Sequence, residues 1–350
     1  MGSEMCIRDS SCTYEISILA YNSDSTYVAV SDKISFYADL PKLPDFNYIT
    51  TSSVDHDDGA VDVSCYIDNT AVISRYEIHR SERTSNNFSN IASLPVPGSG
   101  DMIYYHDIGV ETKDHFYQYK VFPIDTCGET ISTPTVPGIV DEESLSQTIL
   151  LETEINTDYA AIIYPEEYTN SIHFNNYIEW LGGVSHYNLY RSVNREPFVL
   201  VPLHTFYPGD SLFYIDIVSE FVDGNGRFCY YIEAVEGNGN NYSFSEMSFS
   251  NLSCISQTPK LFIPNSFTPN DDEHNEVFRP VTSFVSEEGY SFSIYNRSGE
   301  EIFHTDIPSK GWDGKYNGVE AQNGDYVYHV KYINGIGEIT EKTDVVSLVR

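Results

Sequence analysis

Basic residues are scarce in this chain. Its 350 residues include 19 Lys and Arg against 52 Asp and Glu, which gives a formal net charge of −33. This charge would repel a phosphate backbone or an anionic lipid surface, so we expect neither nucleic acid nor a membrane surface as a partner. The acidity itself favours solubility.

Long apolar runs are missing as well. The longest, such as Ala160 to Tyr164, are strand-sized, whereas a membrane helix needs roughly 18 to 20 apolar residues, so the sequence predicts no transmembrane segment. The opening residues, MGSEMCIRDS, lack the basic and apolar regions of a secretory signal peptide. We interpret them as a fragment boundary or a sequencing scar.

Catalytic signatures are absent too. The sequence contains no nucleophile elbow, H-E-x-x-H motif, glycine-rich phosphate loop or kinase signature. Its ten His are scattered, and its carboxylates are too numerous for one pair to indicate a glycosidase. We therefore predict no catalytic residues, no enzyme activity and no cofactor, apart from a weak Ca²⁺ candidate.

Aromatic residues are abundant, with 28 Tyr and 19 Phe, and they favour strands. Segments of about five to eight alternating apolar and polar residues recur between Gly, Asn, Asp, Ser and Pro clusters, so the chain is predicted to be all-β. One such segment places Tyr326, Tyr328, Val330 and Tyr332 on one face, as in a half-buried strand.

A weak internal repeat divides the chain. The matched pairs are 76–81 (YEIHRS) with 187–192 (YNLYRS), 105–108 (YHDI) with 214–217 (YIDI), and 116–121 (FYQYKV) with 228–233 (FCYYIE), at shifts of 111, 109 and 112. Residues 11–16 (SCTYEI) fit the same slot in an earlier copy. The period suits an immunoglobulin-like sandwich of some seven short strands.

The repeat resembles fibronectin type III modules, with 76–80 as strand C, 105–107 as strand E and 116–121 as strand F. This resemblance implies tandem β-sandwiches, and the chain is predicted to end in a small C-terminal antiparallel β-sandwich. The predicted domains are a truncated module at 1–40, modules at 43–138 and 146–258, and a C-terminal domain at 260–350.

The six Cys show no spacing suited to zinc. Pairing within each repeat predicts two disulfides, Cys65–Cys127 and Cys229–Cys254, and the alternative is that all are buried free thiols. The shorter loop would contribute about 3.5 kcal/mol and the longer about 4.3 kcal/mol in the chain-entropy model.

The last ninety residues differ from the rest. An ordered series of motifs runs through them, from an opening PNSFTPN through IYNRSGEEIF, GWDG and NGDYVY to a terminal VSLVR. Three Asn-Gly pairs, at 317, 323 and 334, predict tight hairpin turns. The motif residues are Pro264, Asn265, Phe267, Thr268, Pro269, Asn270, Asn296, Arg297, Gly299, Trp312, Asp313, Gly314, Tyr326 and Tyr328.

These motifs resemble the gliding-motility-associated C-terminal domain, the type B sorting domain of the type IX secretion system. The resemblance implies export by the type IX translocon and contact with outer-membrane anchoring components. It places the protein outside a Gram-negative cell, secreted or at the surface, where oxidising conditions favour disulfides. Two departures stand out: the family's Gly-Asp-Gly turn after FTPN is replaced by Asp271 to Glu276, and the hairpin Trp by Ser298.

Two further features have both a functional and a structural interpretation. Hard oxygen ligands for Ca²⁺ cluster at Asp271, Asp272, Glu273, Asn275 and Glu276, although a solvated turn is favoured. Trp180 and Tyr177, near Tyr187 and Tyr190, could form a platform for sugars, although a sandwich core is favoured.

The leading hypothesis is the C-terminal part of an exported surface protein whose sandwich modules serve as stalk or adhesion elements. One alternative is the non-catalytic end of an extracellular hydrolase with its catalytic domain upstream. Another is that the modules bind a surface glycan or protein ligand.

Overall fold

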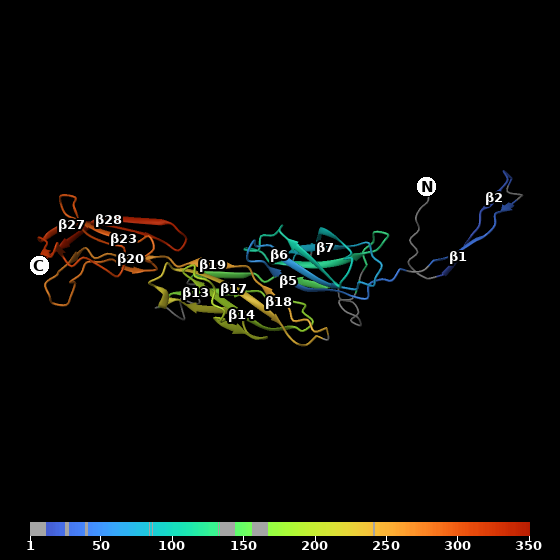
Figure 1. Ribbon diagram of the computed structural model, residues 1–350, viewed down its shortest axis with the longest axis horizontal. Coiled ribbons are helices and arrows are strands. Elements are labelled where there is room, and N and C mark those ends of the chain that lie inside the picture. The colour runs from blue at the N-terminus through green and yellow to red at the C-terminus, as the bar shows by residue number, and fades with distance from the viewer. Residues whose placement is uncertain are drawn as a thin grey trace. The chain divides into compact units, whose positions relative to one another are not determined.

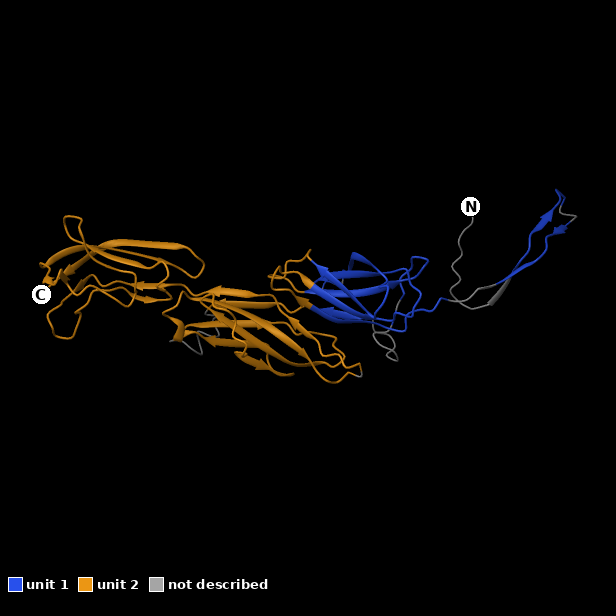
Figure 2. Cartoon of the chain, viewed as in Figure 1, with its two compact units in different colours: residues 1–52, 62–107, 117–147 blue, residues 53–61, 108–116, 148–350 orange. Residues whose placement is uncertain are grey.

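The computed structural model describes residues 12–24, 28–38, 41–83, 85, 87–131, 133, 144–155, 167–240 and 242–350. The described residues are built from β-strands and carry one short 3₁₀-helix, so the all-β prediction is confirmed. Figure 2 shows the two compact units, which comprise residues 1–52, 62–107 and 117–147, and residues 53–61, 108–116 and 148–350. No helix in the described part of the chain is long and apolar enough to cross a membrane.

Short ladders open the chain, where the truncated module is predicted. β1 pairs with β4 and β2 with β3, both antiparallel. Apolar side chains of these ladders are exposed, including Ile18 and Ile34, each 70% exposed. The strands are β1 (Cys12–Ile16), β2 (Leu19–Tyr21), β3 (Val28–Val30) and β4 (Ile34–Ala38). Residues 1–11 of the predicted 1–40 module lie outside the described residues.

The first sandwich has one sheet in the order β5-β6-β9 and another in the order β11-β10-β7-β8. Strands β7, β9 and β10 contain the predicted strands C, E and F, and seven strands in two sheets match the fibronectin-like expectation. The strands are β5 (Asn47–Val54), β6 (Val61–Ile67), β7 (Arg75–Glu82), β8 (Ser89–Pro95), β9 (Met102–Asp107), β10 (Tyr117–Ile124) and β11 (Leu145–Gln147).

The second sandwich repeats this topology, with sheets β12-β13-β16 and β15-β14-β17-β18, and β19 also pairs with β17 (Figure 1). Its elements are β12 (Leu151–Ile155), β13 (Thr169–Phe174), β14 (Val184–Val193), β15 (His204–Phe206), β16 (Phe213–Ile217), η1 (Ser219–Phe221), β17 (Arg227–Glu236), β18 (Met247–Phe249) and β19 (Ser253–Ser256). Trp180, Tyr177 and Tyr187 are buried in its core, which confirms the core interpretation of these aromatics.

The structure corrects the third pair of the repeat by one residue. Tyr119 lies opposite Arg80, and Tyr230 lies opposite Arg191, so the shift along this strand is 111 rather than 112. Because neighbouring residues of a strand face opposite sides, the one-residue error would have exchanged the core and solvent faces. Tyr119 is the counterpart of Tyr230, and both are buried.

This register reveals a partly buried polar cluster in both sandwiches that sequence reasoning missed. Arg80 Nη1 donates to both carboxylate oxygens of Asp107, at 2.9 and 2.7 Å, and the Tyr119 hydroxyl donates to the same carboxylate at 2.9 Å. Arg191, Asp216 and Tyr230 form the same cluster in the second sandwich. Each cluster thus joins the two sheets of its sandwich, because the Asp carboxylate comes from one sheet and its Arg and Tyr donors come from the other.

One predicted disulfide is present and the other is not. Cys229 and Cys254 lie opposite each other on β17 and β19 and are bonded, as predicted. The Cys65–Cys127 pairing is wrong, since Cys65 is a free thiol. Its Sγ points into the core and donates to Asn47 Oδ1 at 2.8 Å. Cys127 instead lies in the exposed turn after β10 and is bonded to another cysteine.

The C-terminal domain is a five-stranded sheet in the order β21-β28-β27-β23-β24 with two small ladders, β20-β22 and β25-β26. Its core contains Tyr328, Val330 and Tyr332, the face predicted from alternation, and Tyr326 packs against that core. The strands are β20 (Lys260–Phe262), β21 (Ser266–Phe267), β22 (Val281–Ser283), β23 (Ser291–Tyr295), β24 (Glu301–Thr305), β25 (Lys315–Tyr316), β26 (Val319–Glu320), β27 (Gly324–Ile333) and β28 (Ile339–Leu348).

Only one of the three Asn-Gly pairs forms the expected two-residue turn. Asn317 and Gly318 both have positive φ, 52° and 77°, between β25 and β26. Gly324 instead begins β27, and the turn between β27 and β28 runs from Asn334 to Glu338. There the Asn334 side chain accepts the backbone N–H groups of Ile336 and Glu338. An Asn-Gly pair therefore indicated a turn region more reliably than a turn type.

One residue of the C-terminal domain belongs to the neighbouring core. Phe284, which follows β22, is fully buried among the core residues of the second sandwich. Its ring meets Tyr168 edge-on, with centroids 4.8 Å apart, and its backbone N–H donates to Val222 O at 2.5 Å. Its φ of 58° is rare for a bulky side chain, so these contacts hold it in a strained conformation. The domain has its own core but shares this residue.

Candidate functional site at the motif end of the C-terminal domain

The terminal residue, Arg350, joins three segments that are far apart in sequence. Its guanidinium donates to three backbone carbonyls: Pro269 O at 3.1 Å, Ala321 O at 2.7 Å and Gly314 O at 2.9 Å. These carbonyls come from the opening motif, from the segment before β27 and from the GWDG turn. A planar group suits this role because three different nitrogens, Nε, Nη1 and Nη2, each reach one carbonyl, whereas a lysine carries all its donors on a single nitrogen.

Gly314 leaves the space that this arrangement needs. Its φ is 77°, and a Cβ there would lie 2.8 Å from Arg350 Nη2 and 2.9 Å from Pro269 Cγ. Any side chain would therefore displace the guanidinium or the proline. The last Gly of GWDG and the terminal Arg thus depend on each other.

The other GWDG residues are structural. Trp312 is fully buried, its Nε1 donates to Lys315 O at 2.8 Å, and its backbone pairs with Phe278. The Asp313 carboxylate accepts the Lys315 N–H at 3.0 Å, as expected for a turn residue. Together these bonds fix the turn that leads into β25.

The opening motif runs beside the chain end. Phe267 is buried in the core, and β21 lies parallel to β28. Asn265 O accepts the Ser347 N–H, and Thr268 N–H donates to Asn275 O. Pro264 precedes β21, and Asn270 Oδ1 accepts the Asp272 N–H at 3.2 Å.

The acidic loop after FTPN uses carboxylates as turn caps. Asp272 Oδ1 accepts the His274 N–H at 2.9 Å, and Glu276 Oε1 accepts the Asp272 N–H at 2.8 Å. Asp271, Glu273 and Asn275 have φ values of 61°, 67° and 57°. These residues therefore adopt backbone conformations that glycine favours, which explains how the loop forms without the family's two glycines. A Ca²⁺ role for the loop stays a prediction.

The NRSGE hairpin is also held by its own side chains. Asn296 Oδ1 accepts the N–H groups of Ser298 and Glu300, and Gly299 supplies a φ of 78°. The Glu300 carboxylate then accepts the Tyr316 hydroxyl at 2.8 Å, a bond that raises the pKa of Tyr316. This bond ties the β23–β24 turn to the β25–β26 hairpin.

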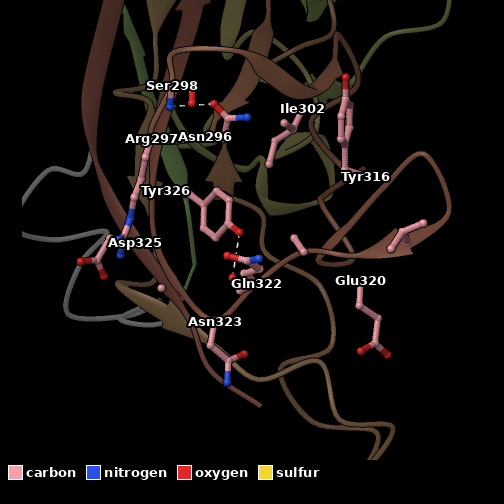
Figure 3. Close-up of a pocket in the computed structure, with 13 residues that line it drawn as sticks. Asn296, Arg297, Ser298, Ile302, Tyr316, Glu320, Gln322, Asn323, Asp325 and Tyr326 are labelled. Atoms are coloured by element: carbon pink, nitrogen blue, oxygen red, sulfur yellow. Dashed lines mark hydrogen bonds between the residues drawn. The ribbon is translucent and has the colours of Figure 1, made fainter.

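A pocket of about 380 Å³ lies between these two turns and the start of β27 (Figure 3). Figure 3 shows Tyr326 in the middle of the lining residues, with its hydroxyl donating to Gln322 O at 2.8 Å. A second hollow of about 330 Å³ shares Glu320 with this pocket and is also lined by Arg350 and Asp313. Of the motif residues, Asn296, Arg297 and Tyr326 line the first pocket and Pro269 and Asp313 line the second, whereas Phe267, Trp312 and Tyr328 belong to the core of the domain.

Residues 261–347 match the CHU_C type IX secretion signal domain. The chain carries a type IX secretion signal. The match confirms the predicted sorting domain and supports an exported protein, secreted or at the cell surface. No curated protein matches the chain.

Three solved structures are similar to larger parts of the chain. A tetra-tandem repeat from the extending region of a large adhesion protein has 16% identity and a TM-score of 0.30, covering 97% of this chain and 82% of that one. The FN1–FN3 domains of chicken CNTN1 have 11% identity and a TM-score of 0.21, covering 89% and 99%. Dimeric latent PorU from Porphyromonas gingivalis has 11% identity and a TM-score of 0.20, covering 89% and 34%. At these values, the similarities say nothing about ligand or activity.

Sequence reasoning found the motif residues but missed two that organise them. Arg350 was noted only as the end of a terminal motif, and Ala321 carried no signal at all. A single arginine forms no sequence pattern, and only the fold shows that three backbone carbonyls surround it.

Proposed function

We propose that residues 260–350 act as the sorting signal that directs this chain through the type IX translocon to the exterior of a Gram-negative cell. Outer-membrane anchoring components would be its second set of partners. The two sandwiches before it would serve as non-catalytic stalk or adhesion modules without a cofactor. The match of residues 261–347 to the secretion signal family carries this proposal.

The geometry supports the same function. A sorting signal that a receptor recognises needs a defined surface. The end of the domain that contains Pro269, Gly314 and Ala321 supplies one, because Arg350 holds these three segments together. The partly buried Arg80–Asp107 and Arg191–Asp216 pairs join the sheets of each sandwich, and charge-assisted hydrogen bonds of this kind suit modules that keep one shape.

The test compares the full chain with a chain lacking residues 260–350 in a bacterium that has a type IX system. Both are expressed behind the same cleavable leader for crossing the inner membrane, and periplasmic and extracellular fractions are measured by immunoblot. The truncated chain should accumulate in the periplasm. Equal extracellular amounts of the two chains would disprove the sorting role.

A further inference from the structure

The motif side chains can be sorted by whether the fold uses them. Asn296 caps a turn, Trp312 and Tyr328 pack in the core, and Tyr326 bonds Gln322 O. Arg297 differs from these, because it is exposed and its guanidinium makes no hydrogen bond or ion pair with any residue that the structure describes. In a chain with 52 acidic and 19 basic residues, a motif arginine left without an acidic partner suggests a role outside the fold.

The backbone beneath Arg297 is shaped to receive its side chain. Gly324 has a φ of 145°, and a Cβ at this position would lie 2.9 Å from Arg297 Nη2. Glycine therefore leaves room for the guanidinium over the start of β27, where a side chain would require it to shift. Asp325, on the same side in Figure 3, accepts the Ser347 hydroxyl at 2.7 Å, so its carboxylate is engaged by its own domain.

The pocket beside Arg297 has an apolar part and a rigid floor. Tyr326 packs edge-on against buried Trp312, with centroids 4.8 Å apart, and this contact fixes its ring. Val319 lines the pocket and is 69% exposed. Ile302 contributes a further apolar side chain, Gln322 and Asn323 add amides, and the carboxylates of Glu320 and Asp325 leave Arg297 as the one basic group of the lining. A volume of about 380 Å³ is within the range of binding sites for a small group or a few side chains.

We propose that this pocket binds a segment of the export machinery in which a carboxylate stands next to an apolar side chain. Arg297 would pair with the carboxylate through two parallel N–H donors, and the apolar side chain would lie against Val319 and Tyr326. This inference rests on the proposed sorting function and names the chemistry of its partner. A guanidinium at the edge of the pocket gives specificity for a carboxylate and orients the bound segment.

The experiment measures export of the full chain carrying Arg297→Glu, Arg297→Gln or Arg297→Lys. Extracellular protein should fall at least tenfold for the Glu and Gln variants and less for the Lys variant. Lys342→Glu is the matched control, because Lys342 is exposed on β28 and outside the pocket, and the charge change is the same. Its export should equal that of the unmodified chain.

The apolar part of the pocket is tested in the same assay. Val319→Asp should reduce export, whereas Val281→Asp, at an exposed position on β22 outside the pocket, should not. Thermal unfolding of each purified variant is measured alongside, and the variants should unfold within about 2 °C of the unmodified chain.

Export of Arg297→Glu at the unmodified level, or an equal loss in Arg297→Glu and Lys342→Glu, would overturn the inference. These outcomes are separate from failure of the sorting function. If deletion of residues 260–350 blocks export but Arg297→Glu does not, the domain is the signal and this pocket is not its point of recognition.

Discussion

Arg350→Ala tests whether Arg350 holds together the segments that contain Pro269, Gly314 and Ala321. The substitution removes three hydrogen bonds from a charged donor to backbone carbonyls. Two of the three bonds are exposed to solvent, so we assign about 1 kcal/mol to each rather than the larger value for buried charged donors. The expected loss is about 3 kcal/mol of local stability, or roughly a 100-fold rise in the local opening constant.

Native-state hydrogen exchange measures this opening directly. The Ala321 N–H donates to Gly314 O at 2.9 Å, and the Val349 N–H donates to Phe267 O at 3.2 Å. Exchange at both amides therefore reports whether the segments that Arg350 joins have separated. They should exchange about 100-fold faster in Arg350→Ala and at an intermediate rate in Arg350→Lys, which keeps charge but not geometry. Amides in β14 are the internal control. Unchanged exchange at both reporters would refute the role assigned to Arg350.

Three further predictions concern the modules and their link to the signal. Burial of the Asp68 carboxylate raises its pKa, but hydrogen bonds from Thr70, Asp45 and Lys42 outweigh burial and lower the pKa to about 2. This carboxylate should therefore add up to about 2 kcal/mol to the free energy of unfolding above pH 4, and this contribution should disappear as the pH falls toward 2. In urea unfolding, Asp68→Asn should lack this fall in stability between pH 4 and pH 2. The same fall in the variant would contradict the prediction. Replacing Cys229 and Cys254 by Ser should cost about 3.5 kcal/mol, seen as a lower calorimetric transition of the second sandwich, and an unaltered transition would contradict the prediction. Phe284→Ala should cost about 3 to 5 kcal/mol and speed exchange in β17, whereas Phe262→Ala, at a position 67% exposed, should leave both unchanged; equal effects of the two variants would exclude a specific contact.

The sequence predicted those features that repeat or that follow a local rule. Alternation in 326–332 identified the buried face of β27, and the repeat located strands C and E in both sandwiches. The motifs of the tail were sufficient to identify the secretion signal, because their order and spacing are local properties of the chain.

The remaining features depend on which atoms the fold brings together. Around Tyr230 and Tyr231, adjacent aromatic residues made two alignments equally good, and only the cross-strand register with Arg191 decides between them. The pairing of Cys65 with Cys127 failed because spacing does not show that Cys65 faces the core. Phe284 and Arg350 are single residues whose partners lie in distant segments, so no local pattern could indicate them.

The most direct test of the central claim asks whether the domain is sufficient for export. Residues 146–350 are fused to a periplasmic reporter, since this segment includes both the signal and the sandwich core that holds Phe284. Reporter activity should appear outside cells with a functional type IX system, and cells lacking that system should retain the reporter in the periplasm. Reporter that stays in the periplasm of both strains, with the fused segment intact and folded, would contradict the claim.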